Sequence, residues 1–401
     1  MKNRLYSISI RNIFIYSTLF ACLTNSLDLS ILHISFNPFL YLSLISFILT
    51  LLTKIIKKEI SFKFDTYLLL FFLFILFLST VCSIYNYNSN SLVLLFINFV
   101  IIIGLYICNN NLNFNIIYKM IVWFSTVMII TSFLLFLFNY NFVFYGNKFT
   151  GLYTNPNLGS QITMISILII AFFIKNDIYD KKINIFFLCT HLLFLYFNMS
   201  KNTYLILLII LLISFFRNKG TKFLLFSFFL FLFLVFFLII FNRDILFSSS
   251  LNISDYTNVE IFLNEISTER YAIWKESIYM IGNSILLGYG INNLSSVASI
   301  QIGNFSRIVE RNITATHNIF LQVFFDGGIF SFLIFTAFIC FITYKIFLIL
   351  RRNGMFSKKG FPCTLVIASL LFSQLDVGII NYFVITSFIF WTHAKEIRIS
   401  K

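Results

Sequence analysis

Residues 66–85, TYLLLFFLFILFLSTVCSIY, contain no charged side chain and are mostly apolar. A helix needs about 20 apolar residues to cross a hydrocarbon core that is roughly 30 Å thick. Backbone polar groups must be paired inside lipid, so such a run crosses either as a helix or as part of a closed barrel. The run is unbroken rather than alternating, which excludes the barrel and predicts a membrane-spanning helix.

Runs of this kind recur along the whole chain. The 401 residues are 59% hydrophobic and only 11% charged, whereas soluble globular proteins are about 25% charged. We therefore predict an all-α polytopic membrane protein that forms one integral membrane domain over residues 1–401, with about twelve transmembrane helices. The predicted spans are residues 12–27, 31–52, 66–85, 91–108, 118–138, 158–174, 183–199, 202–216, 223–241, 329–350, 362–377 and 379–394.

Positive charge predicts the orientation, because cytoplasmic loops of membrane proteins are enriched in Lys and Arg. The chain has 29 Lys and Arg residues and a net charge of +14. With both termini in the cytoplasm, few of these cations lie outside, and a shift by one span would reverse the bias. This rule explains most of the net charge, which is no indication of nucleic-acid binding. The outer cations are Lys148, Lys201, Arg243, Arg270, Lys275, Arg307 and Arg311.

One long polar interval interrupts the apolar runs. We predict that residues 242–328 form a large extracytoplasmic loop with short interfacial helices, and that its cations carry the chemistry. Arg270 begins the segment RYAIWKESIYMIGNSILLGYG (270–290), whose helical spacing of residues predicts an amphipathic helix at the interface. Arg270 either stacks on Trp274, one turn further on, or binds an anion through its planar guanidinium.

The same loop holds a candidate base and a second pair of cations. Arg307 and Arg311 are one helical turn apart and would share one face of a helix as a two-cation clamp, with Glu310 able to pair with one of them. His317 is the only histidine in the loop. Imidazole can accept a proton near neutral pH, so His317 is a candidate catalytic residue, although a lone loop histidine is often incidental.

Two lysines lie in shorter outer loops. Lys148 lies in YGNKFTGLYTNPNLG (145–159), where Asn155 and Pro156 are typical of an N-cap and the first residue of a helix. Lys148 is either a solvated loop lysine or part of an anion site. Lys201, in a tight turn between spans, either reaches lipid headgroup phosphates or binds a substrate phosphate. The sequence has no metal-ligand cluster, Gly-rich phosphate loop or nucleophile elbow, so we expect no metal and no cofactor.

Three stretches carry a resemblance to a known family: GLYTNPNLG (151–159), the segment 270–290 with its Arg, Trp and Gly-Tyr-Gly pattern, and THNIFLQVFFDGGIFSFLIF (316–335). On these motifs the chain resembles the bacterial O-antigen polymerase and O-antigen ligase family. The resemblance implies metal-independent, inverting glycosyl transfer at the outer face of the bacterial cytoplasmic (inner) membrane. The implied donor is a glycan carried on undecaprenyl diphosphate.

The resemblance also implies roles for individual residues. His317 would be the general base on the acceptor hydroxyl, and Arg270 would bind the diphosphate with help from Arg307 or Arg311. Where the family often has Ser-Arg, this chain has Ser200 followed by Lys201. Lysine keeps the charge but lacks the bidentate fork of arginine.

We predict a polymerase that joins undecaprenyl-diphosphate-linked repeat units of O-antigen or capsular polysaccharide, with membrane lipid and a chain-length regulator protein as further partners. The alternative within the family is a ligase that transfers finished polymer to the lipid A core. A transporter or flippase for the same units is a second alternative. It predicts ionisable residues within the spans, where Asp376 is the main example. A multi-span polyprenyl-phosphate glycosyltransferase would need paired acidic residues in the first outer loop, which offers only Asp28.

Overall fold

The structure, a computed structural model, is built almost entirely from helices. It describes residues 10–27, 37–56, 64–82, 89–108, 113–138, 143–145, 148–215, 264, 267, 270–303, 306–310, 313–374 and 384–399. The helices in its first half are α1 (Ile10–Thr24), α2 (Pro38–Ile56), α3 (Phe64–Val81), α4 (Ser89–Cys108), α5 (Phe114–Leu137), α6 (Pro156–Lys175), α7 (Lys181–Asn198) and α8 (Lys201–Phe215). Those in its second half are α12 (Arg270–Asn283), α13 (Leu294–Gln301), α14 (Arg307–Glu310), α15 (Ile319–Asn353), α16 (Phe361–Ser373) and α17 (Ile385–Ile399). Two short strands, β1 (Phe144–Tyr145) and β2 (Lys148–Phe149), pair antiparallel.

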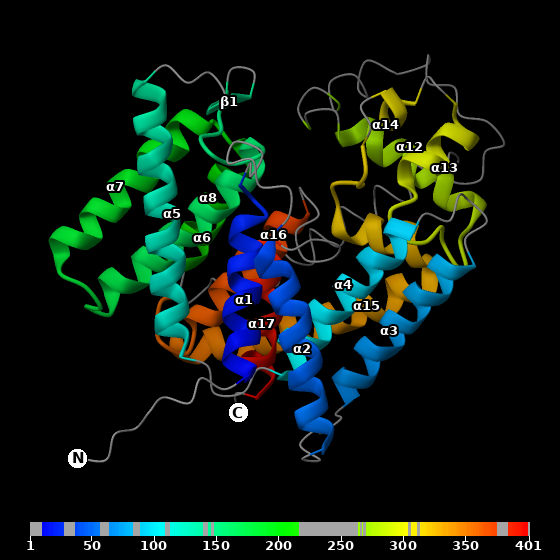
Figure 1. The fold of residues 1–401 in the computed structure, drawn as a ribbon, viewed down its shortest axis with the longest axis horizontal. Coiled ribbons are helices and arrows are strands. Elements are labelled where there is room, and N and C mark those ends of the chain that lie inside the picture. The colour runs from blue at the N-terminus through cyan, green and yellow to red at the C-terminus, as the bar shows by residue number, and fades with distance from the viewer. Residues whose placement is uncertain are drawn as a thin grey trace.

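The helices form three groups side by side, with a fourth group at one end (Figure 1). Helices α5 to α8 form one side, α1, α2, α16 and α17 the middle, and α3, α4 and α15 the other side. The short helices α12, α13 and α14 lie at one end of the molecule, whereas the C-terminal end of α17 lies at the other (Figure 1). Helix α17 contacts α1, α4, α6, α15 and α16, so it is the central helix of the bundle.

Every predicted span except the ninth coincides with a helix, and residues 223–241 lie outside the described part of the chain. The helices nearest to residues 31–52 and 379–394 begin about two turns later than predicted, at Pro38 and Ile385. Within the described residues, α5, α6 and α15 are long and apolar enough to cross a membrane, and several shorter helices are also apolar. The prediction of an all-α membrane protein is confirmed in this form, and the count of twelve spans stays a prediction.

The outer surface of the bundle is apolar, as expected for helices that face lipid. Helix α3 exposes Tyr67, Phe71 and Phe74 at 58%, 54% and 53% of their surface, and these residues recur at intervals of three and four on one face. Soluble monomers rarely expose large contiguous apolar patches. Contact with acyl chains accounts for such a face without any protein partner.

Two histidines in the helical bundle connect neighbouring helices. His191 on α7 lies 2.8 Å from Ser125 on α5, which lies 2.8 Å from Ser166 on α6. His393 on α17 lies 2.7 Å from the hydroxyl of Tyr118 on α5. Both imidazoles are fully buried and also contact a backbone carbonyl one turn earlier in their own helix. These contacts give both histidines a structural role.

A second hydrophobic core lies outside the main bundle. We use the term loop domain for residues 270–303, 306–310 and 313–327, which comprise α12, α13, α14 and the first part of α15. Helix α15 is two helices joined at Gly328, whose backbone (φ 67°, ψ −167°) is not helical. The break separates residues 319–327 from the span that is predicted to begin at residue 329. The core of the loop domain consists of Ile273, Ile278, Tyr279, Met280, Ile281, Tyr289, Leu294, Val297, Ala298, Ile308, Leu321, Phe324 and Phe325.

Candidate functional site

The Gly-Tyr-Gly and Asp-Gly-Gly segments of the sequence pair with each other at the break in α15. Residues 285–290 run beside residues 325–329, and a backbone N–H from each segment donates to the other. Three hydrogen bonds of 2.8 Å join them: Tyr289 N to Phe325 O, Gly290 N to Asp326 O, and Ile329 N to Ile285 O. The pairing satisfies backbone groups that the break in the helix leaves open.

The glycines in these segments are required by that close approach. Gly288 and Gly328 both have positive φ, at 69° and 67°, a region that residues with a Cβ rarely adopt. A Cβ on Gly288 would lie 2.5 Å from Phe325 O, and a Cβ on Gly328 would collide with Leu286 O. Gly290 (φ 78°) lies against the backbone of Thr80 at the end of α3. The glycine pattern therefore fixes the loop domain to both α15 and α3.

His317 has a left-handed backbone, with φ of 54°, and a partly exposed side chain. The peptide that precedes it is held on both sides. The N–H of Thr316 donates to Gln322 Oε1 at 2.8 Å, and the carbonyl of Thr316 accepts from Trp274 Nε1 at 3.0 Å. The indole of Trp274 therefore ties the helix that begins with Arg270 to the residue before His317.

The residue after His317 is held as firmly. Asn318 is the N-cap of α15, and its Oδ1 accepts from the N–H groups of Phe320 and Leu321 at 3.0 and 3.2 Å. The hydroxyl of Thr316 donates to the carbonyl of Asn318 at 2.9 Å. Both side chains are buried. The backbone around His317 is thus fixed by side chains on both of its flanks.

A buried carboxylate orients the glutamine in this network. Gln322 Nε2 donates to Asp326 Oδ1 at 2.8 Å, one helical turn further along α15. Both residues are at most 2% exposed. Because the amide nitrogen of Gln322 is directed to Asp326, its oxygen faces Thr316 N. We define the His317 clamp as Trp274, Thr316, Asn318, Gln322 and Asp326.

Arg270 is the first residue of α12, and Ser267 precedes it at the same end. The hydroxyl of Ser267 accepts from Tyr271 N at 3.0 Å, and Arg270 Nη1 donates to the Ser267 carbonyl at 3.4 Å. Arg270 is partly exposed. Arg270 lies one turn before Trp274 on α12, and the Trp274 indole donates to the carbonyl of Thr316, the residue before His317. Helix α12 therefore connects Arg270 to the backbone beside His317. Stacking of Arg270 on Trp274 stays a prediction.

The predicted amphipathic helix at the interface is wrong for α12. Ten of its residues are buried, on all of its faces, including Lys275 and Glu276. The loop folds around its own core, and α12 packs against α13, α14 and α15. Glu276, for example, bonds to the start of α14 inside the loop domain.

Glu276 holds the short helix that carries Arg307. Its carboxylate accepts from Ser306 Oγ at 2.6 Å, from Arg307 N at 2.9 Å and from Ile308 N at 3.3 Å. Burial raises the pKa of the Glu276 carboxyl, and these hydrogen bonds oppose the rise. A carboxylate at a helix start also interacts favourably with the open N–H groups there.

The side chain of Arg307 points outward. It is 49% exposed and pairs with Glu310 at 3.1 Å, which confirms the predicted pairing of Glu310 with one arginine. Such an exposed pair contributes little to stability, so the guanidinium can exchange partners. Arg311 lies outside the described residues, and the two-cation clamp of Arg307 and Arg311 therefore stays a prediction.

The two lysine candidates lie together at another place. Lys148 is exposed in β2, and Asn198 Nδ2 at the end of α7 donates to the adjacent Phe149 O at 2.9 Å. Lys201 is the exposed first residue of α8, which follows α7 after a turn of two residues.

The predicted N-cap of α6 is confirmed. The side-chain oxygen of Asn155 accepts from Leu158 N at 2.9 Å.

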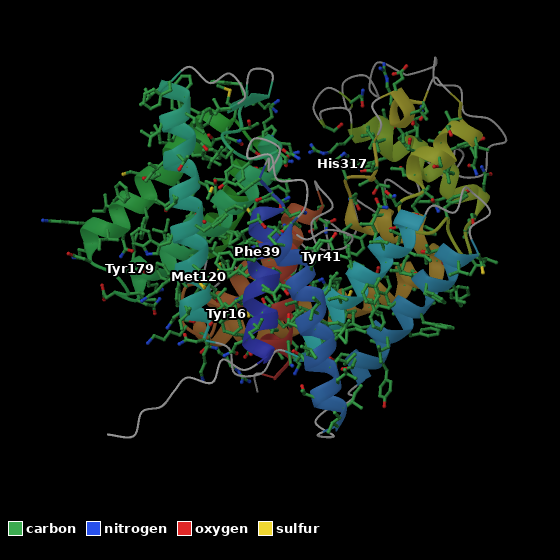
Figure 2. All side chains as sticks on the ribbon, viewed as in Figure 1. Tyr16, Phe39, Tyr41, Met120, Tyr179 and His317 are labelled. Carbon is green, nitrogen blue, oxygen red and sulfur yellow. The ribbon has the colours of Figure 1, made fainter. Side chains whose placement is uncertain are left out.

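The two groups of candidates lie at the same end of the molecule. The β1–β2 hairpin and the loop domain are both at the end away from the last residues of α17 (Figure 1). In Figure 2, His317 lies on the side of the loop domain that faces α6 and α8. The described contacts join Arg270, Arg307 and His317 through the loop domain, and they join Lys148 and Lys201 through the end of α7.

One comparison with known proteins finds a family match over part of the chain. Residues 185–336 match the family model described as O-antigen ligase. This stretch is an O-antigen ligase family domain. It runs from α7 through the loop domain into α15 and includes two of the three stretches on which the resemblance rests. The resemblance to the O-antigen polymerase and ligase family is therefore confirmed over these residues.

The match to the O-antigen ligase family indicates a general class of activity. Members of the family are membrane enzymes of glycan transfer that act on lipid-linked glycans. Together with the apolar helices, the domain indicates a multi-pass inner-membrane protein. The comparison with curated proteins and the comparison with solved structures each give no match.

Proposed function

We propose that this protein polymerises undecaprenyl-diphosphate-linked oligosaccharide units at the outer face of the inner membrane. The support is the geometry around His317. A histidine in a left-handed conformation, held on both flanks by buried hydrogen bonds, sits in one framework with Arg270. Strained backbones of this kind persist where the surrounding structure over-determines them, and they concentrate at functional sites.

In the proposed reaction His317 acts as the general base. Its imidazole accepts the proton of a sugar hydroxyl on the acceptor unit. The hydroxyl oxygen forms a bond to the anomeric carbon of the donor glycan from the opposite face. The bond from that carbon to the diphosphate oxygen breaks, and its electron pair leaves with the undecaprenyl diphosphate.

The cations stabilise the leaving group. Negative charge grows on the diphosphate as the glycosidic bond breaks, so preformed positive groups lower the barrier. Arg270 is proposed to donate two parallel hydrogen bonds from its guanidinium to phosphate oxygens. Arg307, Arg311, Lys148 and Lys201 are proposed as further diphosphate contacts.

The first test compares two residues that share a backbone conformation. His317→Ala and Asn292→Ala each remove a polar side chain from a left-handed, partly exposed position of the loop domain. We expect His317→Ala to abolish polymer in a deletion strain, and Asn292→Ala to restore the wild-type chain length. Wild-type polymer from His317→Ala at normal protein level would exclude His317 as the base.

The second test addresses orientation. In a cysteine-free background, Glu310→Cys and Lys359→Cys place a thiol at exposed positions in the loop domain and in the α15–α16 connection. We expect a membrane-impermeant maleimide to label Glu310→Cys in intact spheroplasts and Lys359→Cys only after lysis. The reverse pattern would exclude chemistry at the outer face.

A ligase that transfers polymer to the lipid A core is the second candidate, because the matching family model is described as O-antigen ligase. The lipid-linked material in a deletion strain separates the two functions. Single repeat units accumulate if the protein is a polymerase. Finished lipid-linked polymer accumulates if it is a ligase.

A further inference from the structure

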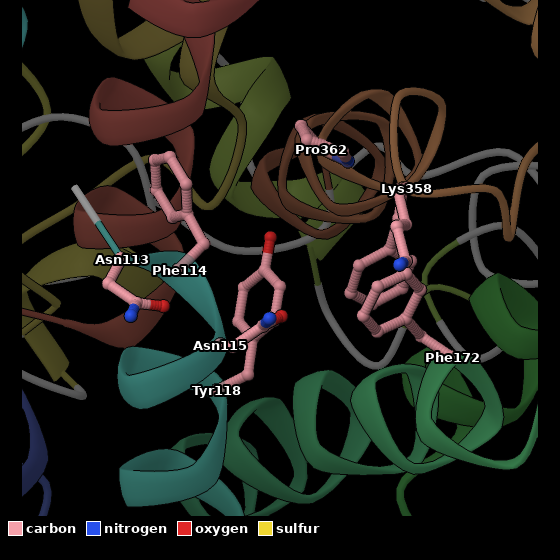
Figure 3. A pocket seen from close by; sticks show the side chains of 8 residues that line it. Asn113, Phe114, Asn115, Tyr118, Phe172, Lys358 and Pro362 are labelled. Carbon is pink, nitrogen blue, oxygen red and sulfur yellow. The ribbon is translucent and has the colours of Figure 1, made fainter. Parts of the chain in front are cut away.

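A pocket lies at the end of the molecule away from the loop domain. Its volume is about 480 Å³, within the size range of small-molecule sites. It lies where α5 and α16 begin, beside the connection from α15 to α16 (Figure 3). The residues that line it are Asn113, Phe114, Asn115, Tyr118, Phe172, Lys358, Phe361 and Pro362.

The floor of this pocket is a rigid aromatic cluster. Phe172 and Phe361 stack at 4.3 Å between ring centroids with 9° between their planes. Tyr118 meets both rings edge-on, at 5.9 and 5.3 Å. The hydroxyl of Tyr118 is already bonded to His393, so the floor offers an apolar surface to a ligand.

The rim of the pocket is polar and positive. Asn113, Asn115 and Lys358 are all exposed. Figure 3 shows Asn113 on one side of Tyr118 and Lys358 on the other, with Asn115 over the Tyr118 ring in this view. None of the lining residues is acidic. An ammonium group and two amide groups at the rim of an apolar floor suit an anion attached to a less polar body.

The starts of two helices add to the positive charge at the rim. Asn113 is the N-cap of α5 and lines the pocket, but its side chain makes no capping hydrogen bond. Helices α5 and α16 both start at the pocket, and helix N-termini carry partial positive charge. These dipoles reinforce Lys358, and the cavity with its lysine remains the basis of the site.

We propose that this pocket binds the phosphate group of an anionic ligand, with Lys358 and Asn115 as its contacts. The orientation in the proposed function places this end at the cytoplasmic leaflet. The phosphate then belongs either to an anionic phospholipid headgroup or to a soluble phosphate ester. In both cases the phosphate meets the rim and the glyceryl or acyl part meets the aromatic floor.

The test uses the purified full-length protein in detergent and follows thermal unfolding during titration with ligand. The probes are phosphatidylglycerol, phosphatidylcholine and glycerol 3-phosphate. The variants are Lys358→Gln and Asn115→Asp, with Lys359→Gln as the matched control, because Lys359 is the adjacent exposed lysine outside the lining.

We expect phosphatidylglycerol to raise the unfolding temperature of the wild type and of Lys359→Gln, and phosphatidylcholine to have a smaller effect. Loss of a charged hydrogen bond to the phosphate in Lys358→Gln should weaken the apparent affinity roughly tenfold or more. A shift produced by glycerol 3-phosphate, and lost in Lys358→Gln, would identify the soluble ester as the source.

Equal weakening in Lys358→Gln and Lys359→Gln would overturn the proposal, because it would reflect general surface charge. Unchanged affinity in both pocket variants would overturn it as well. This binding assay needs no glycosyl transfer, so His317→Ala should bind the probes as the wild type does. Failure of the proposed catalysis and failure of this site are therefore distinguishable.

Discussion

Replacement of Gln322 by Leu tests whether the His317 clamp serves the reaction. Leucine is similar in size but can neither accept from Thr316 N nor donate to Asp326. Thr316 is fully buried, so its N–H would lose the 2.8 Å bond without access to water. The backbone at His317, with φ of 54°, could then relax towards an extended conformation.

The magnitude follows from that buried donor. An unsatisfied buried N–H costs about 1–3 kcal/mol, and relaxation of the left-handed residue is the easiest way to recover that free energy. If returning His317 to its left-handed conformation costs the same free energy of about 1–3 kcal/mol, the rate of transfer falls by about 5- to 150-fold. The measurement is the rate of repeat-unit addition in membranes, normalised to folded protein.

Gln301→Leu is the matched control. Gln301 on α13 also makes two side-chain hydrogen bonds, to Tyr289 at 2.9 Å and from Asn283 at 3.0 Å, but neither reaches the clamp. We expect this variant to add repeat units at the wild-type rate. The reasoning is refuted if Gln322→Leu keeps that rate, or if both variants lose activity equally at equal folded amount.

Three further predictions address other parts of the loop domain. Arg270→Lys keeps the charge but loses the bidentate fork, so the affinity for the donor should fall roughly tenfold. The affinity of Arg270→Ala should fall further, and the KM for the lipid-linked donor measures both effects. Because the pKa of Glu276 is raised in the folded protein, its stabilising contribution is complete below pH 4.5 and is lost as the pH rises through the folded-state pKa. The unfolding temperature of the wild type should therefore fall relative to that of Glu276→Gln as the pH rises through this range. Gly328→Ala should destabilise the protein by more than about 3 kcal/mol, whereas Gly303→Ala, with φ of 88° and open space around it, should lose about 1 kcal/mol; thermal unfolding of the two variants checks this.

The apolar spans and the break at Gly328 were predictable because each depends on local sequence. Unbroken apolar runs require helices in lipid, and two adjacent glycines interrupt a helix. The burial of α12 was not predictable in this way. Lys275 and Glu276 would face solvent in an isolated helix, and only the fold of the whole loop shows that Glu276 meets the start of α14.

The site was predictable as a set of residue types but not as a geometry. His317 and Arg270 follow from their chemistry and from the family motifs. Gln322 and Asp326, one turn apart, were visible in the motif as a pair on one helix face. Their function depends on a contact with Thr316, whose carbonyl in turn meets Trp274, 42 positions earlier in the chain. No local pattern contains that information.

The position of the clamp on α15 gives a physical reason for its construction. Residues 319–327 form the short helix between His317 and the break, and at 1.5 Å per residue this helix is about 13 Å long. Beyond Gly328 the second helix of α15 continues as an apolar span. The imidazole is therefore held at a set distance from a segment that lipid fixes in place. In the proposed function the diphosphate of the donor is also confined to a narrow depth by its polyprenyl tail, so the imidazole and the diphosphate would meet at a constant depth in the membrane. If His317 is the base, holding it in place in this way supplies part of the orientation that the transfer requires.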